Sequence, residues 1–96
     1  MQDFVPLDQV CREFEISLVT LRRYSRVASI RPARRDGQLG FRPHQIRRLW
    51  SILSLHRELG VNLPGVELIL HMHDRMVEIE RRHRALLDEL RSRIAP

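Results

Sequence analysis

The sequence predicts a mainly α-helical protein, in which a small domain of short helices and one β-hairpin is followed by a long C-terminal helix. Three observations lead to this fold class. Apolar residues recur at helical spacing in several segments, a Gly- and Pro-containing stretch near the middle carries a hairpin signal, and residues 66–94 contain no helix breaker. With 96 residues, the chain has room for one such domain and an appended helix.

The composition excludes several other classes of protein. An apolar content of 43% suits a globular protein rather than a disordered one. The single cysteine, Cys11, excludes an intramolecular disulfide and a multi-cysteine zinc site. No apolar run approaches the roughly 18 residues that a membrane-spanning helix needs. We therefore expect a soluble, cytoplasmic protein with no membrane partner.

Positive charge is concentrated in one part of the chain. The net charge is +5, and all 17 basic residues are arginine. Residues 17–50 contain nine arginines and one acidic residue, Asp36, whereas residues 51–96 carry as many acids as arginines. This asymmetry favours a polyanionic partner, with a merely solvated basic surface as the alternative.

Two short helices joined by a three-residue turn are predicted near the N-terminus. Apolar residues spaced by three and four mark the first helix, Leu7–Phe14. Ser17 is a natural N-cap for a second helix that runs to about Val27. On that helix we expect Leu18 and Leu21 to face inward. The positions expected to face outward are Val19, Arg22, Arg23 and Arg26. This is a helix-turn-helix pattern whose second helix is rich in arginine.

A small two-stranded wing is predicted within residues 29–42. Asp36-Gly37 tolerates the positive φ angles of a tight hairpin turn, and Leu39 and Phe41 alternate toward one side. The arginines that flank this turn are Arg34, Arg35 and Arg42.

A third helix is expected to have Pro43 in its first turn and to end before Gly60, which would be its C′ residue. Arg47 and Arg48 are expected on its solvated face, with phosphate contact as the alternative. Its predicted apolar stripe consists of Ile46, Leu49, Trp50 and Leu53.

The fourth and longest helix is expected to be capped by Asn62 and to run from Pro64 to about Ile94. Its apolar stripe fits a heptad repeat with a polar histidine at one a position. We expect residues 1–62 to form a winged helix-turn-helix domain and residues 63–96 a coiled-coil dimerisation helix. The alternative is that this helix folds back onto its own domain. The predicted dimerisation residues are Ile69, Met72, Met76, Ile79, His83, Leu86 and Leu90.

No motif for catalysis or cofactor binding occurs. The serines lack a nucleophile elbow, and no Gly-rich phosphate loop or dinucleotide motif is present. His71 and His73 lie two positions apart on a predicted helix, about 200° apart around its axis, and cannot both face one metal. Cys11 is expected to be a small core residue. We therefore expect no enzymatic activity, no cofactor and no metal site.

Double-stranded DNA is the partner that the basic segment suggests. A recognition helix needs an N-terminal end that reaches base edges and flanks that hold phosphates, and arginine serves both purposes. Tyr24 has two interpretations, a DNA contact or a core residue three positions after Leu21. The candidate DNA-binding residues are Thr20, Arg22, Arg23, Tyr24, Arg26, Arg34, Arg35 and Arg42.

Several segments resemble the MerR-type winged helix-turn-helix family. They are residues 17–24 (SLVTLRRY), 30–32 (IRP), Asp36-Gly37, Phe41 and 45–49 (QIRRL). The junction at residues 55–66 (LHRELGVNLPGV) is similar to the branch that holds the heat-shock repressor HspR and the chaperone modulator CbpM. The resemblance covers roughly Val5 to Met76.

This resemblance implies one of two functions. An HspR-like repressor dimerises through its last helix and places the second helix of each copy in successive major grooves. A CbpM-like modulator instead binds and restrains the J-domain of a DnaJ-like co-chaperone, and residues 37–43 (GQLGFRP) look more like this type. We favour a homodimeric DNA-binding regulator, associated with the nucleoid when bound, because so much positive charge lies where DNA would lie.

Overall fold

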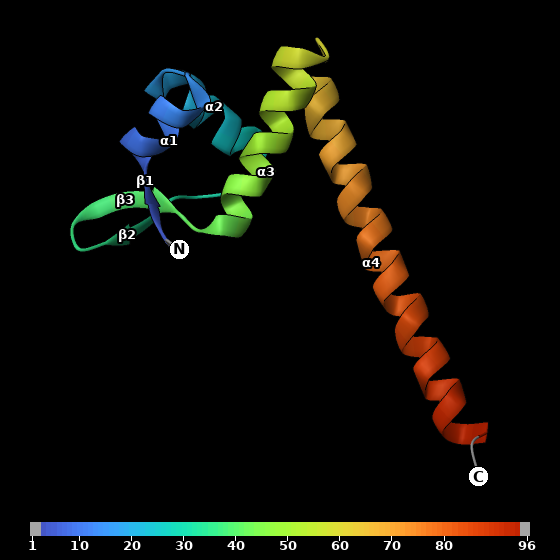
Figure 1. Ribbon diagram of the computed structural model, residues 1–96. Coiled ribbons are helices and arrows are strands. Elements are labelled where there is room, and N and C mark those ends of the chain that lie inside the picture. Colours follow the sequence, from blue (N-terminus) through green and yellow to red (C-terminus); the bar gives the residue numbers. More distant parts are fainter. Residues whose placement is uncertain (1–2, 95–96) are drawn as a thin grey trace.

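The computed structural model describes residues 3–94, which form five helical segments and three short strands (Figure 1). In chain order these are β1 (Val5–Pro6), α1 (Leu7–Phe14), α2 (Leu18–Val27), β2 (Ala33–Arg35), β3 (Gln38–Phe41), α3 (Pro43–Leu53), η1 (Ser54–Glu58) and α4 (Leu63–Ile94). The predicted fold class is confirmed, and the bounds predicted for the first two helices are correct.

Helices α1 and α2 form the helix-turn-helix. The Ser17 hydroxyl accepts a hydrogen bond from the Thr20 backbone N–H at 3.1 Å, as expected of an N-cap. Leu21 is completely buried, whereas Leu18 is 43% exposed, so the prediction that both face inward is wrong for Leu18. Leu18 is the first residue of the helix, and the buried face of α2 centres instead on Leu21, Tyr24 and Ser25.

The wing contains one strand more than predicted. Asp36 and Gly37 adopt φ angles of 51° and 79°, which makes the two-residue turn between β2 and β3. On the other side of β3, β1 pairs antiparallel through Val5 and Phe41, giving the strand order β1-β3-β2. A two-residue strand carries no alternation that a sequence pattern could reveal, so β1 was not predicted.

Gly40 is required where β1 crosses close to β3. A Cβ atom at Gly40 would lie 2.5 Å from the Val5 carbonyl oxygen and 2.6 Å from the Phe4 ring. We expect Gly40→Ala to lower the free energy of unfolding by about 1–3 kcal/mol, because β1 must shift to admit the methyl group. Urea unfolding measures this change, with the neighbouring Leu39→Ala, at a 37% exposed side chain, as the control. Equal stabilities of the two variants would contradict the argument.

The core lies where α1, α2, α3 and the start of α4 meet. On α3 the buried face consists of Leu49, Ile52 and Leu53, because positions spaced by three and four share one side of a helix. Trp50, predicted in the apolar stripe, is 51% exposed and lies at the edge of this face. Its ring meets Phe14 edge-on, with centroids 5.2 Å apart.

A π-helical segment, η1, joins α3 to the final turn before α4. Its Leu59 N–H bonds the Ser54 carbonyl at 3.1 Å, five residues back, and Gly60 has the predicted positive φ of 72°. Asn62 caps α4 as predicted, with its Oδ1 accepting from the Gly65 N–H at 2.8 Å. The π-helical turn was not predicted, because it differs from an α-helix in hydrogen bonding rather than in residue pattern.

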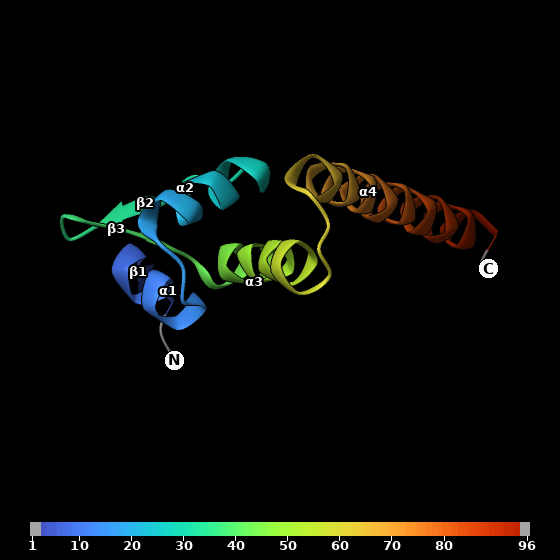
Figure 2. The same ribbon diagram turned by 90° about the horizontal axis from the view of Figure 1, so that it is seen from above.

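Helix α4 projects out of the domain. Figures 1 and 2 show it running away from α1–α3 for most of its length, and the described residues span 58 × 35 × 19 Å. Only Val66 and Leu70 are buried in its 32 residues, so its first two turns complete the core. The alternative in which this helix folds back onto its own domain is therefore wrong. No helix within residues 3–94 has the length and apolarity to span a membrane.

Candidate nucleic-acid interface

The outward face of α2 is basic and unpaired. Val19, Arg22, Arg23 and Arg26 follow the spacing of one helix face, and all four are exposed, as predicted. Among residues 3–94, no carboxylate lies within ion-pair distance of these three arginines. Their guanidinium groups are therefore available to an external anion.

A largely apolar groove of about 550 Å³ runs between α2 and the wing. Leu18 of α2 and Leu39 of β3, 43% and 37% exposed, both line it, and so do Arg22 and Arg26. Arg31, which was not among the predicted DNA-binding residues, lines the same groove. Its place in residues 30–32, which resemble the MerR type, could have indicated it. The remaining lining residues are Leu7, Val19, Leu21, Ser25, Ile30, Pro32 and Phe41.

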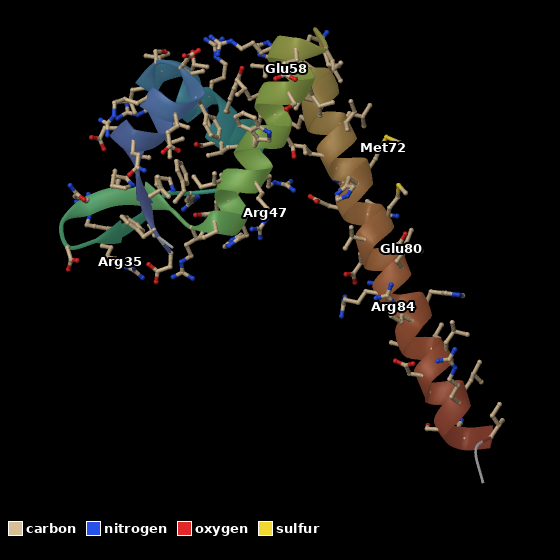
Figure 3. The ribbon with its side chains drawn as sticks, viewed as in Figure 1. Arg35, Arg47, Glu58, Met72, Glu80 and Arg84 are labelled. Atoms are coloured by element: carbon tan, nitrogen blue, oxygen red, sulfur yellow. The ribbon has the colours of Figure 1, made fainter. Side chains whose placement is uncertain are left out.

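The two wing arginines Arg34 and Arg35 lie on opposite faces of the sheet, because successive residues of a strand alternate. Arg34 pairs across the hairpin with Leu39, and its Nη1 donates to the Gly37 carbonyl at 3.2 Å. Arg35 forms a 2.8 Å ion pair with Asp3 and lies 5.3 Å from the centre of the Phe4 ring. Hydrogen bonding to Arg35 lowers the pKa of Asp3. Figure 3 shows Arg35 on the side of the wing away from α1.

Arg42 belongs to a second basic hollow, at the start of α3. Arg35, Arg42, His44 and Arg47 line it together with Asp3 and Pro43. The Arg42 backbone N–H donates to Gln45 Oε1 at 2.9 Å, which caps the helix without engaging the guanidinium. The eight candidate residues therefore do not form one continuous surface. Arg22 and Arg26 line the groove, whereas Arg34 lines a smaller hollow that shares Leu7 and Leu39 with it. Arg35 and Arg42 line the separate hollow at the start of α3.

Tyr24 is a core residue, which resolves the two interpretations of it. Its side chain is 2% exposed, and its hydroxyl lies 2.9 Å from His56 Nδ1 in η1. A contact between Tyr24 and DNA is incompatible with this burial. Arg57, next to His56, donates to the Phe14 and Glu15 carbonyls at 3.2 Å, so η1 contacts the C-terminal end of α1 as well as Tyr24 of α2.

Thr20 lies at the N-terminal end of α2 and is half-buried. Its Oγ1 accepts a hydrogen bond from the Ser17 hydroxyl at 3.1 Å, so the threonine is part of the cap. The Thr20 hydroxyl keeps its own hydrogen as a donor. It remains a candidate contact at the tip of the helix.

Arg48 is a structural link and not part of the solvated face of α3, contrary to the prediction. Its guanidinium binds the Asp74 carboxylate of α4 with two hydrogen bonds of 3.0 and 2.9 Å. Its Nε donates to the Ala28 carbonyl at the end of α2 at 2.7 Å. A single side chain thus ties the end of α2 to α4, the helix that leaves the domain.

Acidification should weaken this link. Hydrogen bonding to Arg48 lowers the pKa of Asp74 below its ordinary 3.8. The link therefore contributes fully above pH 3.8 and is lost as the pH falls through the lowered value. We expect Asp74→Asn to lower the free energy of unfolding at neutral pH by about 1 kcal/mol or less, because the Asp74 side chain is 52% exposed.

Urea unfolding from pH 7 to pH 2 measures the difference between wild type and Asp74→Asn, which should shrink toward zero in acid. Asp88→Asn serves as the control, since Asp88 lies 4.0 Å from Arg91 on the distal part of α4. A difference that stays constant down to pH 2 would contradict the assignment.

Neither the cysteine nor the possible metal ligands of residues 3–94 form a reactive arrangement. Burial raises the pKa of the Cys11 thiol, which disfavours the nucleophilic thiolate. Within residues 3–94, no three His, Cys, Asp or Glu side chains are grouped so that they could hold a metal ion.

Comparison with protein families gives one match. The family model described as "MerR HTH family regulatory protein" matches residues 5–88, which is most of the chain. Searches of curated proteins and of solved structures gave no significant match. Members of the matched family are DNA-binding transcriptional regulators and not enzymes. Together with the helix-turn-helix, the wing and the long final helix, this match shows that the chain belongs to the MerR family of helix-turn-helix regulatory proteins.

Proposed function

We propose that the chain is an HspR-like transcriptional regulator that binds operator DNA as a homodimer. The observation that carries this proposal is the outward face of α2, where Arg22, Arg23 and Arg26 are exposed without an acidic partner in the described chain. A helix with this face fits the major groove, where arginine binds guanine bidentately or grips a phosphate.

The remaining arginines would hold the flanking backbone. Arg34 lines a hollow that shares Leu7 and Leu39 with the groove beside α2, and Arg31 lines that groove. Arg35 and Arg42 would meet phosphates on the far side of the wing. Because the Arg35–Asp3 pair is exposed and therefore weak, a phosphate can replace Asp3 as its partner.

Dimerisation would use residues 63–96, and residues 1–62 would form the DNA-binding domain. Val66 and Leu70 of α4 are buried against that domain and would not take part in the dimer contact. The apolar members of the predicted stripe are between 40% and 59% exposed. A second copy of α4 would bury this stripe, and the polar His83 at an a position would help to set the register. Figure 3 shows Met72 on the side of α4 turned away from α3.

A CbpM-like modulator is the second candidate, and the apolar groove favours it. Leu18, Ile30 and Leu39 line a hollow large enough to receive side chains of a helix from a J-domain. Arg22 and Arg26, which also line this hollow, could then pair with acidic groups of that partner.

One pair of binding measurements separates the two candidates. The full chain is titrated with duplex DNA from its own promoter region over a series of salt concentrations, and separately with a co-encoded J-protein. Sequence-preferring DNA binding that falls steeply with salt supports the regulator. Capture of the J-protein, with DNA bound no more tightly than the non-specific range of about 10⁻⁴–10⁻⁶ M, supports the modulator and overturns the regulator.

A further inference from the structure

Val19 places an apolar side chain at the N-terminal end of α2, the part of the helix that would enter the major groove of DNA first. It is the second residue of the helix, and its side chain is 69% exposed. Leu18 beside it is 43% exposed, and both line the groove that Leu39 borders from the wing. The tip of an otherwise basic face is therefore apolar.

Neither the folding of the domain nor contact with the phosphate backbone of DNA explains an exposed valine at this position. A β-branched side chain at an exposed helix position is a poorer helix former than Ala, Glu, Lys or Arg. Val19 is not part of the buried core, and the charged phosphates offer it no apolar partner. Among the groups on base edges in the major groove, the C5-methyl of thymine is the one that an aliphatic side chain recognises.

We propose that Val19 reads thymine in the major groove by contact between its methyl groups and the C5-methyl of the base, with Leu18 extending the apolar surface. This inference rests on the proposed function, because it requires α2 to lie in the groove. It makes Val19 a specificity-determining residue of the DNA site, whereas the arginines supply most of the affinity.

The helix geometry also places the thymine relative to the arginine contacts. Arg22 and Arg23 follow Val19 by one turn, about 5.4 Å along the helix axis. Base pairs are stacked about 3.4 Å apart. The thymine read by Val19 is therefore expected about one to two base pairs from a guanine or phosphate bound by Arg22 or Arg23.

Replacement of thymine by deoxyuridine tests the contact, because it removes only the methyl group. Duplexes are first recovered by the full chain from a random-sequence pool, and each thymine of the recovered site is then replaced singly. Loss of one buried methyl group corresponds to about fourfold weaker binding. We expect this loss at one thymine of each half-site and about a fifteenfold loss when both are replaced.

The variants Val19→Ala and Val77→Ala assign the effect to one side chain. Val77 lies on α4, outside the dimerisation stripe, and is 50% exposed, so it is a matched control. Val77→Ala should keep the penalty for deoxyuridine. Val19→Ala should bind the thymine and deoxyuridine duplexes equally, with its helical circular dichroism unchanged.

The outcomes distinguish this inference from the proposed function. If binding prefers a sequence but shows no deoxyuridine penalty, or if the penalty persists in Val19→Ala, the recognition of thymine by Val19 is overturned. The proposed regulator function is then unaffected. If the pool yields no preferred sequence, both are overturned, and the apolar tip of α2 belongs to a protein-binding surface.

Discussion

Replacing Arg22 and Arg23 together by alanine is expected to weaken binding to a specific duplex by at least about thirtyfold. Both side chains are exposed on the outward face of α2 and lack an acidic partner in the described chain. A bidentate contact from arginine to a base is worth about 1–3 kcal/mol, and a phosphate contact adds to the salt dependence. Fluorescence anisotropy with a labelled duplex at fixed salt measures the change.

The double variant Arg84→Ala/Arg91→Ala controls for net charge. It removes the same two charges from α4, at heptad positions that face away from the predicted stripe. We expect it to bind within a few-fold of wild type, and we expect only Arg22→Ala/Arg23→Ala to reduce the steepness of the salt dependence. Equal weakening of the two double variants would mean that the α2 arginines act through general charge alone.

A single aspartate in the middle of the α4 stripe should separate the homodimer. Ile79 is 57% exposed in one chain, so Ile79→Asp leaves the fold of the monomer intact. In a dimer it would bury two unpaired carboxylates at a cost of several kcal/mol. Sedimentation should then show a monomer at micromolar concentration. Affinity for an operator with two half-sites should fall by about 10²–10⁴, because the second half-site is no longer tethered to the first.

Val77→Asp is the matched control for this variant. Val77 is 50% exposed, lies two residues from Ile79 and points to another side of the helix. It should sediment as wild type does and bind the same operator equally well. A dimer that survives Ile79→Asp would show that the interface lies elsewhere on the chain.

Much of the fold could be predicted from local pattern. The bounds of α1 and α2 follow from apolar spacing and from the Ser17 cap, and the hairpin turn follows from Asp36-Gly37. Gly60 and Asn62 mark the end of one helical stretch and the start of the next. These features depend on backbone sterics and hydrogen bonds within a few residues, which is the range over which a sequence pattern is informative.

Several of the features that were missed or misassigned depend on remote segments. β1 exists because Val5 meets Phe41 across the sheet, and Arg48 is held because Asp74 and Ala28 lie within its reach. Tyr24 faces inward because its ring packs in the core and its hydroxyl contacts His56. The spacing of residues along the chain does not predict these contacts.

By itself, the sequence determined the order and type of the α-helices and of the hairpin, the basic character of residues 17–50 and the resemblance to the MerR type. Only the tertiary structure decided which arginines share a surface, which one serves as an internal link, and that α4 leaves the domain with its apolar stripe uncovered. The physical reason is one of range. Secondary structure and net charge arise from neighbouring residues, whereas the direction of each face is set by packing between segments far apart in the chain.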